Sequence, residues 1–142
     1  MGSIITDISN QYMKSSFVSP RSGDTVKVSQ KIKEGNKERV QVFQGLVIKS
    51  SNPKNHLSRI YVRKISSGVG VEKSFLLHSP LITKVEIIKR SKVRRNYLSY
   101  MRDRTGKSAR LNAQDFDREK ANFVEETKIM EEKEPEEVTT QE

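Results

Sequence analysis

The chain has 142 residues, of which 33% are apolar, and it contains neither Trp nor Cys. This composition predicts one small domain with appendages, and the absence of Cys excludes disulfides, thiolate chemistry and Cys-based zinc sites. The two histidines, His56 and His78, cannot form a metal site by themselves, so we expect neither a metal nor another cofactor. No apolar run is long enough to span a membrane and no signal-peptide core follows the first residues, which predicts a soluble, cytoplasmic protein without a membrane partner.

The net charge of +9 is distributed unevenly along the chain. Residues 1–110 carry 23 Lys and Arg against 7 Asp and Glu, a net charge of +16, whereas residues 111–142 carry 4 against 11, a net charge of −7. A basic body with an acidic tail indicates that the body binds a polyanion.

Residues 1–16 are expected to form an N-terminal helical segment, because Ile4, Ile8 and Tyr12 recur at helical spacing. Residues 17–90 instead alternate with a period of two and contain turn signals every eight to twelve residues. This pattern predicts five or six short antiparallel strands in a small barrel or sandwich. A change of parity between Val42 and Phe43 predicts a bulge or a sharp bend near Gly45.

Residues 91–111 are predicted to be a basic extension outside the core. The stretch 89–110 contains nine basic residues, one acid and two tyrosines, and we expect Tyr97, Leu98 and Tyr100 to hold it in place. Arg offers a planar fork of donors that suits phosphate oxygens and stacks on bases, which favours a nucleic acid as the polyanion. RNA is favoured over DNA because the sequence has no recognition-helix or dimer signature.

Residues 112–142 are predicted to be an acidic tail that is helical in part or disordered. Phe116, Phe123 and Met130 are spaced by seven, and one apolar stripe that thin gives at best a marginal solitary helix. The remainder has the composition of a disordered segment.

Two glycine motifs resemble parts of nucleotide-binding loops, but neither has the complete pattern. Gly106-Lys107-Ser108 ends like a phosphate-binding loop, but Met101 stands where that loop needs its first glycine. Gly68-x-Gly70 lacks the third glycine and the helix of a dinucleotide site, so it is interpreted as a hairpin turn. Since no acid–base pair or nucleophile is apparent either, we expect no enzyme and no small-molecule substrate.

A second basic group is expected on the strands. Arg63 and Lys64 are neighbours in one strand, so they should point to opposite faces and only one of them can serve a given surface. The members of the group are Arg39, Arg59, Arg63, Lys64 and Lys73.

Four ordered motifs between Phe17 and Leu111 resemble the family of bacterial large-subunit ribosomal protein nineteen. They are "PRSGDTVKV", "EGNKERVQVFQGLVI", "YVRKISSGVGVEKSFLLHSPLI" and "RRNYLSYMRDRTGKSARL". The resemblance implies an SH3-like barrel, bound to large-subunit rRNA, with a basic C-terminal extension. It also implies a place at the subunit interface, in contact with small-subunit rRNA and beside large-subunit ribosomal protein fourteen. Gln44, Leu76 and the tail after Leu111 depart from the family pattern.

The expected RNA-binding residues come from this resemblance together with charge and spacing. Carried over from the motifs are Arg63, Lys64, Arg94, Arg95, Arg102, Arg104, Lys107 and Arg110, to which charge and spacing add Arg39, Arg59 and Tyr97. The predicted function is a structural constituent of the large ribosomal subunit, cytoplasmic and ribosome-bound, whose acidic tail leaves the rRNA surface. The alternative is a free SH3-like protein-interaction module in transcription or translation factor complexes.

Overall fold

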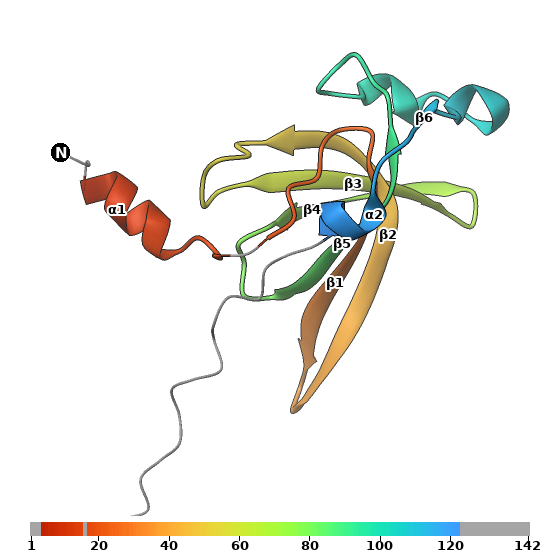
Figure 1. Ribbon diagram of the computed structural model, residues 1–142. Coiled ribbons are helices and arrows are strands. Elements are labelled where there is room, and N and C mark those ends of the chain that lie inside the picture. Colours follow the sequence, from red (N-terminus) through yellow and green to blue (C-terminus); the bar gives the residue numbers. More distant parts are fainter. Residues whose placement is uncertain (1–3, 16, 123–142) are drawn as a thin grey trace, which may run out of the picture.

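The computed structural model describes residues 4–15 and 17–122 of the chain. Its strands form one six-stranded antiparallel sheet in the order β4-β3-β2-β1-β5-β6. In Figure 1 the sheet is strongly curled, and the β1–β2 hairpin projects away from the C-terminal elements. The elements are α1 (Ile4–Gln11), β1 (Thr25–Glu34), β2 (Lys37–Ser51), β3 (Arg59–Ser66), β4 (Val69–Leu76), β5 (Ile82–Ser91), the 3-10 helices η1 (Ser99–Arg102) and η2 (Gly106–Ala109), β6 (Ala113–Gln114) and α2 (Arg118–Asn122).

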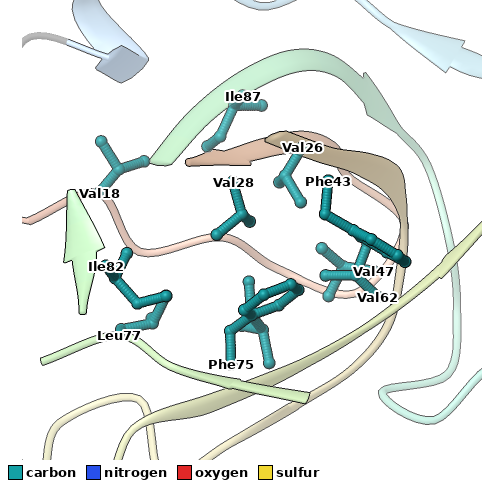
Figure 2. Packing of buried hydrophobic residues seen from close by; sticks show 11 residues of the cluster. Val18, Val26, Val28, Phe43, Val47, Val62, Phe75, Leu77, Ile82 and Ile87 are labelled. Atoms are coloured by element: carbon teal, nitrogen blue, oxygen red, sulfur yellow. The ribbon is translucent and has the colours of Figure 1, made fainter. Parts of the chain in front are cut away.

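The inner face of the curled sheet carries the hydrophobic core, as the period of two predicts. Val26 and Val28 of β1 are fully buried, and Val28 lies directly opposite Phe43 of β2. The ring of Phe43 lies 5.6 Å from that of Phe75 on β4, and Figure 2 shows these side chains converging from the surrounding strands. The other core residues are Val18, Val47, Ile60, Val62, Leu77, Ile82 and Ile87.

The prediction of a mainly β chain folded as a small antiparallel barrel is confirmed, although the barrel is only half closed. Strands β4 and β6 lie at the two ends of the strand order and do not pair with each other. The short β6 covers part of β5, pairing Gln114 with Arg90 and Ala113 with Ser91.

The surroundings of β2 change along its length. Val40 and Val42 are 55% and 46% exposed because they point to the outer face of β2, whereas Phe43 points to the inner face and is buried. This change from the outer to the inner face explains the shift of parity in the sequence. The predicted bulge is absent from the pairing of β1 with β2, whose register runs without a shift along the whole hairpin. The irregularity of β2 lies further on, between Val47 and Lys49, where the strand pairs with β3.

Gly45 is a point of close approach between β2 and β3. A Cβ at this position would collide with the backbone carbonyl of Arg63, so any side chain would push the two strands apart. The glycine that interrupts the strand pattern therefore permits tight strand packing within an unbroken β1–β2 register.

The predicted N-terminal helix is present as α1, but the three residues that predicted it are exposed. Ile4, Ile8 and Tyr12 are 77%, 51% and 67% exposed, and Figure 1 shows α1 standing apart from the barrel. Within the part of the chain that the structure describes, no helix is long and apolar enough to cross a membrane.

The segment after α1 is joined to the barrel at His78. The backbone N–H of Lys14 donates to Nδ1 of His78 at 3.1 Å, and Nζ of Lys14 donates to the carbonyl of Ile82 at 2.6 Å. Phe17 meets the His78 ring edge-on, with the ring centroids 4.2 Å apart. Burial, reinforced by the charge of Lys14, lowers the pKa of His78.

The first part of the predicted acidic tail packs on the barrel. Phe116 and Ala121 contact the core cluster, and the side-chain amide of Asn122 accepts from the N–H of Ile87 at 2.7 Å and donates to its carbonyl at 2.9 Å. Part of this segment is helical, as α2 shows, but the helix is not solitary, because the free edge of β5 offers backbone partners that the sequence pattern does not reveal. Phe123 and Met130 lie outside the described residues.

Candidate RNA-binding surface

The basic extension is anchored by a small hydrophobic cluster on the outer face of β2. Leu98 is fully buried and Met101 is 7% exposed, and both pack against Ile48, which is 1% exposed. The N–H of Leu98 donates to the carbonyl of Ile48 at 2.9 Å. Because Val47 points into the barrel and Ile48 points outward, one strand serves both clusters.

The anchoring residues differ in part from those predicted. Leu98 is confirmed, and Tyr100 is partly buried against the same cluster. Tyr97, however, is 42% exposed and does not belong to it. Met101 was missed, although its position three residues after Leu98 places the two side chains on one face of a 3-10 turn.

A single carboxylate ties the extension to the barrel. Glu72 of β4 accepts from Nε and Nη2 of Arg102 at 2.8 and 2.9 Å, and from Nη1 of Arg63 at 2.8 Å. These hydrogen bonds hold the pKa of Glu72 below its ordinary value, and the bond from Arg102 contributes most. The hydrogen bond to Glu72 in turn raises the pKa of Arg102. Gly70 leaves the space in which the guanidinium of Arg63 lies.

Cations also lie over both tyrosines of the extension. Lys49 and Arg102 lie 5.2 and 5.5 Å from the ring centroid of Tyr97, while Arg104 and Arg95 lie 4.6 and 5.6 Å from that of Tyr100. These contacts limit the motion of long side chains without neutralising their charge. Tyr100 belongs to η1, whereas Tyr97 precedes it, because η1 begins only after Leu98.

The remaining cations of the extension have no carboxylate partner in the part of the chain that the structure describes. The side chains of Arg94, Arg104, Lys107 and Arg110 form no ion pair within residues 4–15 and 17–122, and all four residues are exposed. Lys107 belongs to the 3-10 turn η2, which follows another 3-10 helix and not a strand. The "GKS" stretch therefore lacks the strand that leads into a phosphate loop. We interpret Lys107 as part of a surface for a polyanion and not as part of a pocket for one nucleotide.

The basic residues on the strands are dispersed. Arg63 lies beside the extension, and Arg59 lies two strand periods before it on the same outer face of β3. Arg39 lies near the tip of the β1–β2 hairpin, where it pairs with Glu34 at 2.7 Å. Lys64 points to the inner side, with Nζ 4.7 Å from the ring centroid of Phe43. Arg63 and Lys64 thus occupy opposite faces, as the sequence predicts.

The chemistry of this surface suits anion binding. Among the described residues no group of three or more His, Cys, Asp and Glu side chains could hold a metal ion. Two acids pair with cations beside this surface: Glu72 pairs with Arg63 and Arg102, and buried Asp24 pairs with Arg90 at 3.2 Å.

Comparison with known proteins identifies close relatives of the chain. The family model described as "Ribosomal protein L19" matches residues 3–114. A protein of Mycoplasmopsis pulmonis named "Large ribosomal subunit protein bL19" is 58% identical over 91 residues, which cover 63% of this chain and 78% of the relative. A protein of the same name from Mesomycoplasma hyopneumoniae strain 7448 is 62% identical over 90 residues, which cover 63% of this chain and 73% of the relative.

Proposed function

Because the chain belongs to the Ribosomal protein L19 family, we propose that it is a structural, non-catalytic constituent of the large ribosomal subunit that binds large-subunit rRNA. The observation that carries the proposal is the anchored basic extension, whose outward cations Arg94, Arg104, Lys107 and Arg110 have no carboxylate partner among the described residues. In this proposal the protein is cytoplasmic because it is ribosome-bound.

The proposed mechanism is electrostatic and geometric. The half-closed barrel holds the start of the extension in a fixed position, and the extension lays its cations along the phosphate backbone. Each cation that contacts a phosphate releases a condensed counterion, which makes the affinity depend steeply on salt. RNA binding in this way needs no cofactor and no chemical step.

The predicted RNA-binding residues fall into three groups under this proposal. The unpaired cations contact phosphates directly, with Arg95 and Tyr97 beside them as partners for a phosphate or a base. Arg63 and Arg102 hold the extension in place, because Glu72 already neutralises part of their charge. The strand residues Arg39, Arg59 and Lys64 lie outside the extension and make additional contacts.

The wider assembly also belongs to the proposal. The family resemblance supports contact with small-subunit rRNA across the subunit interface and a neighbouring position for large-subunit ribosomal protein fourteen. We further propose the division of the chain into a helical segment (1–16), a barrel (17–90), a basic extension (91–111) and an acidic tail (112–142). The negative charge of that tail should direct it away from rRNA.

The proposal is tested by the salt dependence of binding to large-subunit rRNA fragments. Replacing Lys107 or Arg104 by Gln should weaken binding and reduce the slope of log affinity against log salt by about 0.7–0.9 for each phosphate that is no longer neutralised. Lys33→Gln, on the projecting β1–β2 hairpin, is the matched control and should leave the slope unchanged. No measurable affinity of the unaltered chain for rRNA would overturn the proposal in favour of a protein-interaction module.

A further inference from the structure

A groove lies beside the point where the extension leaves the barrel. Three segments line it: residues 19–22, the end of β2 with the following loop at Pro53 and Lys54, and residues 93–96. Its volume of about 580 Å³ is within the range of sites that take a small organic ligand. A single nucleotide has a suitable size for such a space.

The charge of the groove is one-sided. Arg21, Lys54, Arg94 and Arg95 contribute four cations to its lining, which contains no carboxylate. The side chains of Arg21, Lys54 and Arg94 have neither a hydrogen bond nor an ion pair in the described part of the chain. Unneutralised cations around one hollow attract an anion, and phosphate offers oxygens to several of them at once.

The lining of the groove also has an apolar part. Pro20 is buried, Val93 is partly buried, and both line the groove together with Pro53. A bare phosphate would leave the accessible surface of Pro53 and Val93 uncovered. A nucleotide would bring its sugar and base against them while its phosphate meets the cations, and Arg guanidinium groups can also stack on an exposed base.

The walls of the groove are held together by hydrogen bonds. The hydroxyl of Ser22 donates to the backbone carbonyl of Asn96 and, at 3.1 Å, to its Oδ1. The N–H of Arg21 donates to the carboxylate of buried Asp24 at 3.0 Å, which Arg90 holds from the other side. The groove is therefore formed before any ligand arrives, which reduces the entropy cost of binding.

We propose that this groove receives one unpaired nucleotide of the bound RNA, with its phosphate on Arg21, Lys54 and Arg94 and its sugar and base against Pro53 and Val93. A base inside a helix is stacked and hidden, so only a bulged or looped nucleotide can enter a hollow. The inference rests on the proposed function and adds to it a preference for a defined feature of the RNA. It also assigns roles to Arg21 and Lys54, which the sequence analysis did not select.

The experiment compares two RNA hairpins that differ by a single unpaired nucleotide in the stem. The full chain should bind the bulged hairpin about tenfold more tightly, the effect of one additional charge-assisted hydrogen bond. Arg21→Gln and Lys54→Gln should remove this preference while the affinity for the continuous stem changes much less. Lys107→Gln, in the extension but outside the groove, should weaken binding of both hairpins equally and keep the preference.

The outcomes separate this inference from the proposed function. If the unaltered chain binds neither hairpin nor rRNA, the proposed function fails and the inference fails with it. If it binds both hairpins equally, the function stands and the groove does not take an unpaired nucleotide. A preference that survives both Arg21→Gln and Lys54→Gln would likewise overturn the assignment to this groove.

Discussion

Glu72 is a carboxylate that stabilises a basic surface. It accepts hydrogen bonds from Arg63 and Arg102, and its side chain is 30% exposed. The bond from Arg102 contributes most to keeping the pKa of Glu72 below its ordinary value of 4.5. Stability from this group is therefore complete above pH 4.5 and is lost as the pH falls through the folded-state pKa.

Replacing Glu72 by Gln should lower the free energy of unfolding by about 1 kcal/mol or less, because partly exposed ion pairs contribute little. It should also reduce the loss of stability below pH 4.5. Urea unfolding of the variant at neutral and acid pH measures both effects. Glu38→Gln, on the same sheet but without an ion pair among the described residues, is the control, and equal acid sensitivity of the two variants would contradict the role of Glu72.

His78 should make the stability depend on pH near neutrality. Its pKa is lowered from 6.5, first by burial and then by the charges of Lys14 and His56, so the unfolded chain binds this proton more readily than the folded one. The contribution of neutral His78 is therefore present above pH 6.5 and is lost as the pH falls through its folded-state pKa. Protonation would also remove the acceptor that Nδ1 offers to the N–H of Lys14.

The prediction for His78 is that stability falls between about pH 7.5 and about pH 5 and that His78→Gln shows a smaller fall. Thermal unfolding across this range measures it. The carboxylates with lowered pKa titrate below this range, since the ordinary value for Glu72 and Glu86 is 4.5. An unchanged pH profile in the variant would show that His78 does not cause the dependence.

The residue-scale predictions from sequence succeeded where local chemistry was sufficient. The opposite faces of Arg63 and Lys64 follow from their being neighbours in one strand, and isolated acids such as Glu72 and Asp24 are rarely left without a cation in a basic chain. Which cations they pair with depends on contacts between β4 and the extension, or between β1 and β5, and no local pattern contains that information. Arg21 and Lys54 were missed for the same reason, since the groove exists only after three distant segments meet.

The extension depends on one small apolar cluster for its position. Leu98→Ala should destabilise the protein by about 2–3 kcal/mol and should accelerate hydrogen exchange at the Leu98 amide, which donates to Ile48. RNA affinity should fall although every cation remains, because the extension would have to be ordered on binding. Hydrogen exchange and a binding titration measure these effects.

Leu57→Ala is the matched control for Leu98, because Leu57 is 50% exposed. It should leave stability, exchange at residue 98 and RNA affinity nearly unchanged. If Leu98→Ala destabilised the protein and left RNA affinity intact, the positioning role of the cluster would have to be abandoned.

The free edge of β5 is covered by the side chain of Asn122. Its amide occupies both the N–H and the carbonyl of Ile87, so Asn122→Ala should cost about 1–2 kcal/mol and accelerate exchange at the Ile87 amide. Asn112→Ala is a suitable control, because Asn112 is exposed and, among the described residues, only its backbone carbonyl accepts a hydrogen bond. Equal exchange at residue 87 in the two variants would show that Asn122 does not protect the edge.

At the scale of elements, the strands were predictable and their extra partners were not. The alternation of Val26 and Val28 with polar residues defines β1 without knowledge of the fold. The irregularity expected near Gly45 lies in the pairing of β2 with β3, between Val47 and Lys49, and not in the β1–β2 hairpin. The packing of residues 113–122 on β5 could not be foreseen, because a free strand edge is a property of the assembled sheet.

In the whole molecule, the residues that stabilise the fold and the residues that are proposed to bind RNA lie on different faces of the sheet. The inner face of the sheet holds the core, while the outer face of β2 and β4 holds the extension through Ile48 and Glu72. Cations gather on the extension and around the adjoining groove, and acids are concentrated after residue 111. This segregation was visible in the sequence, whereas the groove between the barrel and the extension was not.

The central claim is that the chain binds the large ribosomal subunit through the cations of the extension. Sucrose-gradient centrifugation of a native lysate in high salt and low Mg²⁺, followed by detection of the chain in each fraction, tests it most directly. We predict that the chain migrates with the large subunit, and that a variant with Arg94, Arg104, Lys107 and Arg110 changed to Gln is released. Release of the unaltered chain to the top of the gradient, or retention of the variant with the subunit, would contradict the claim.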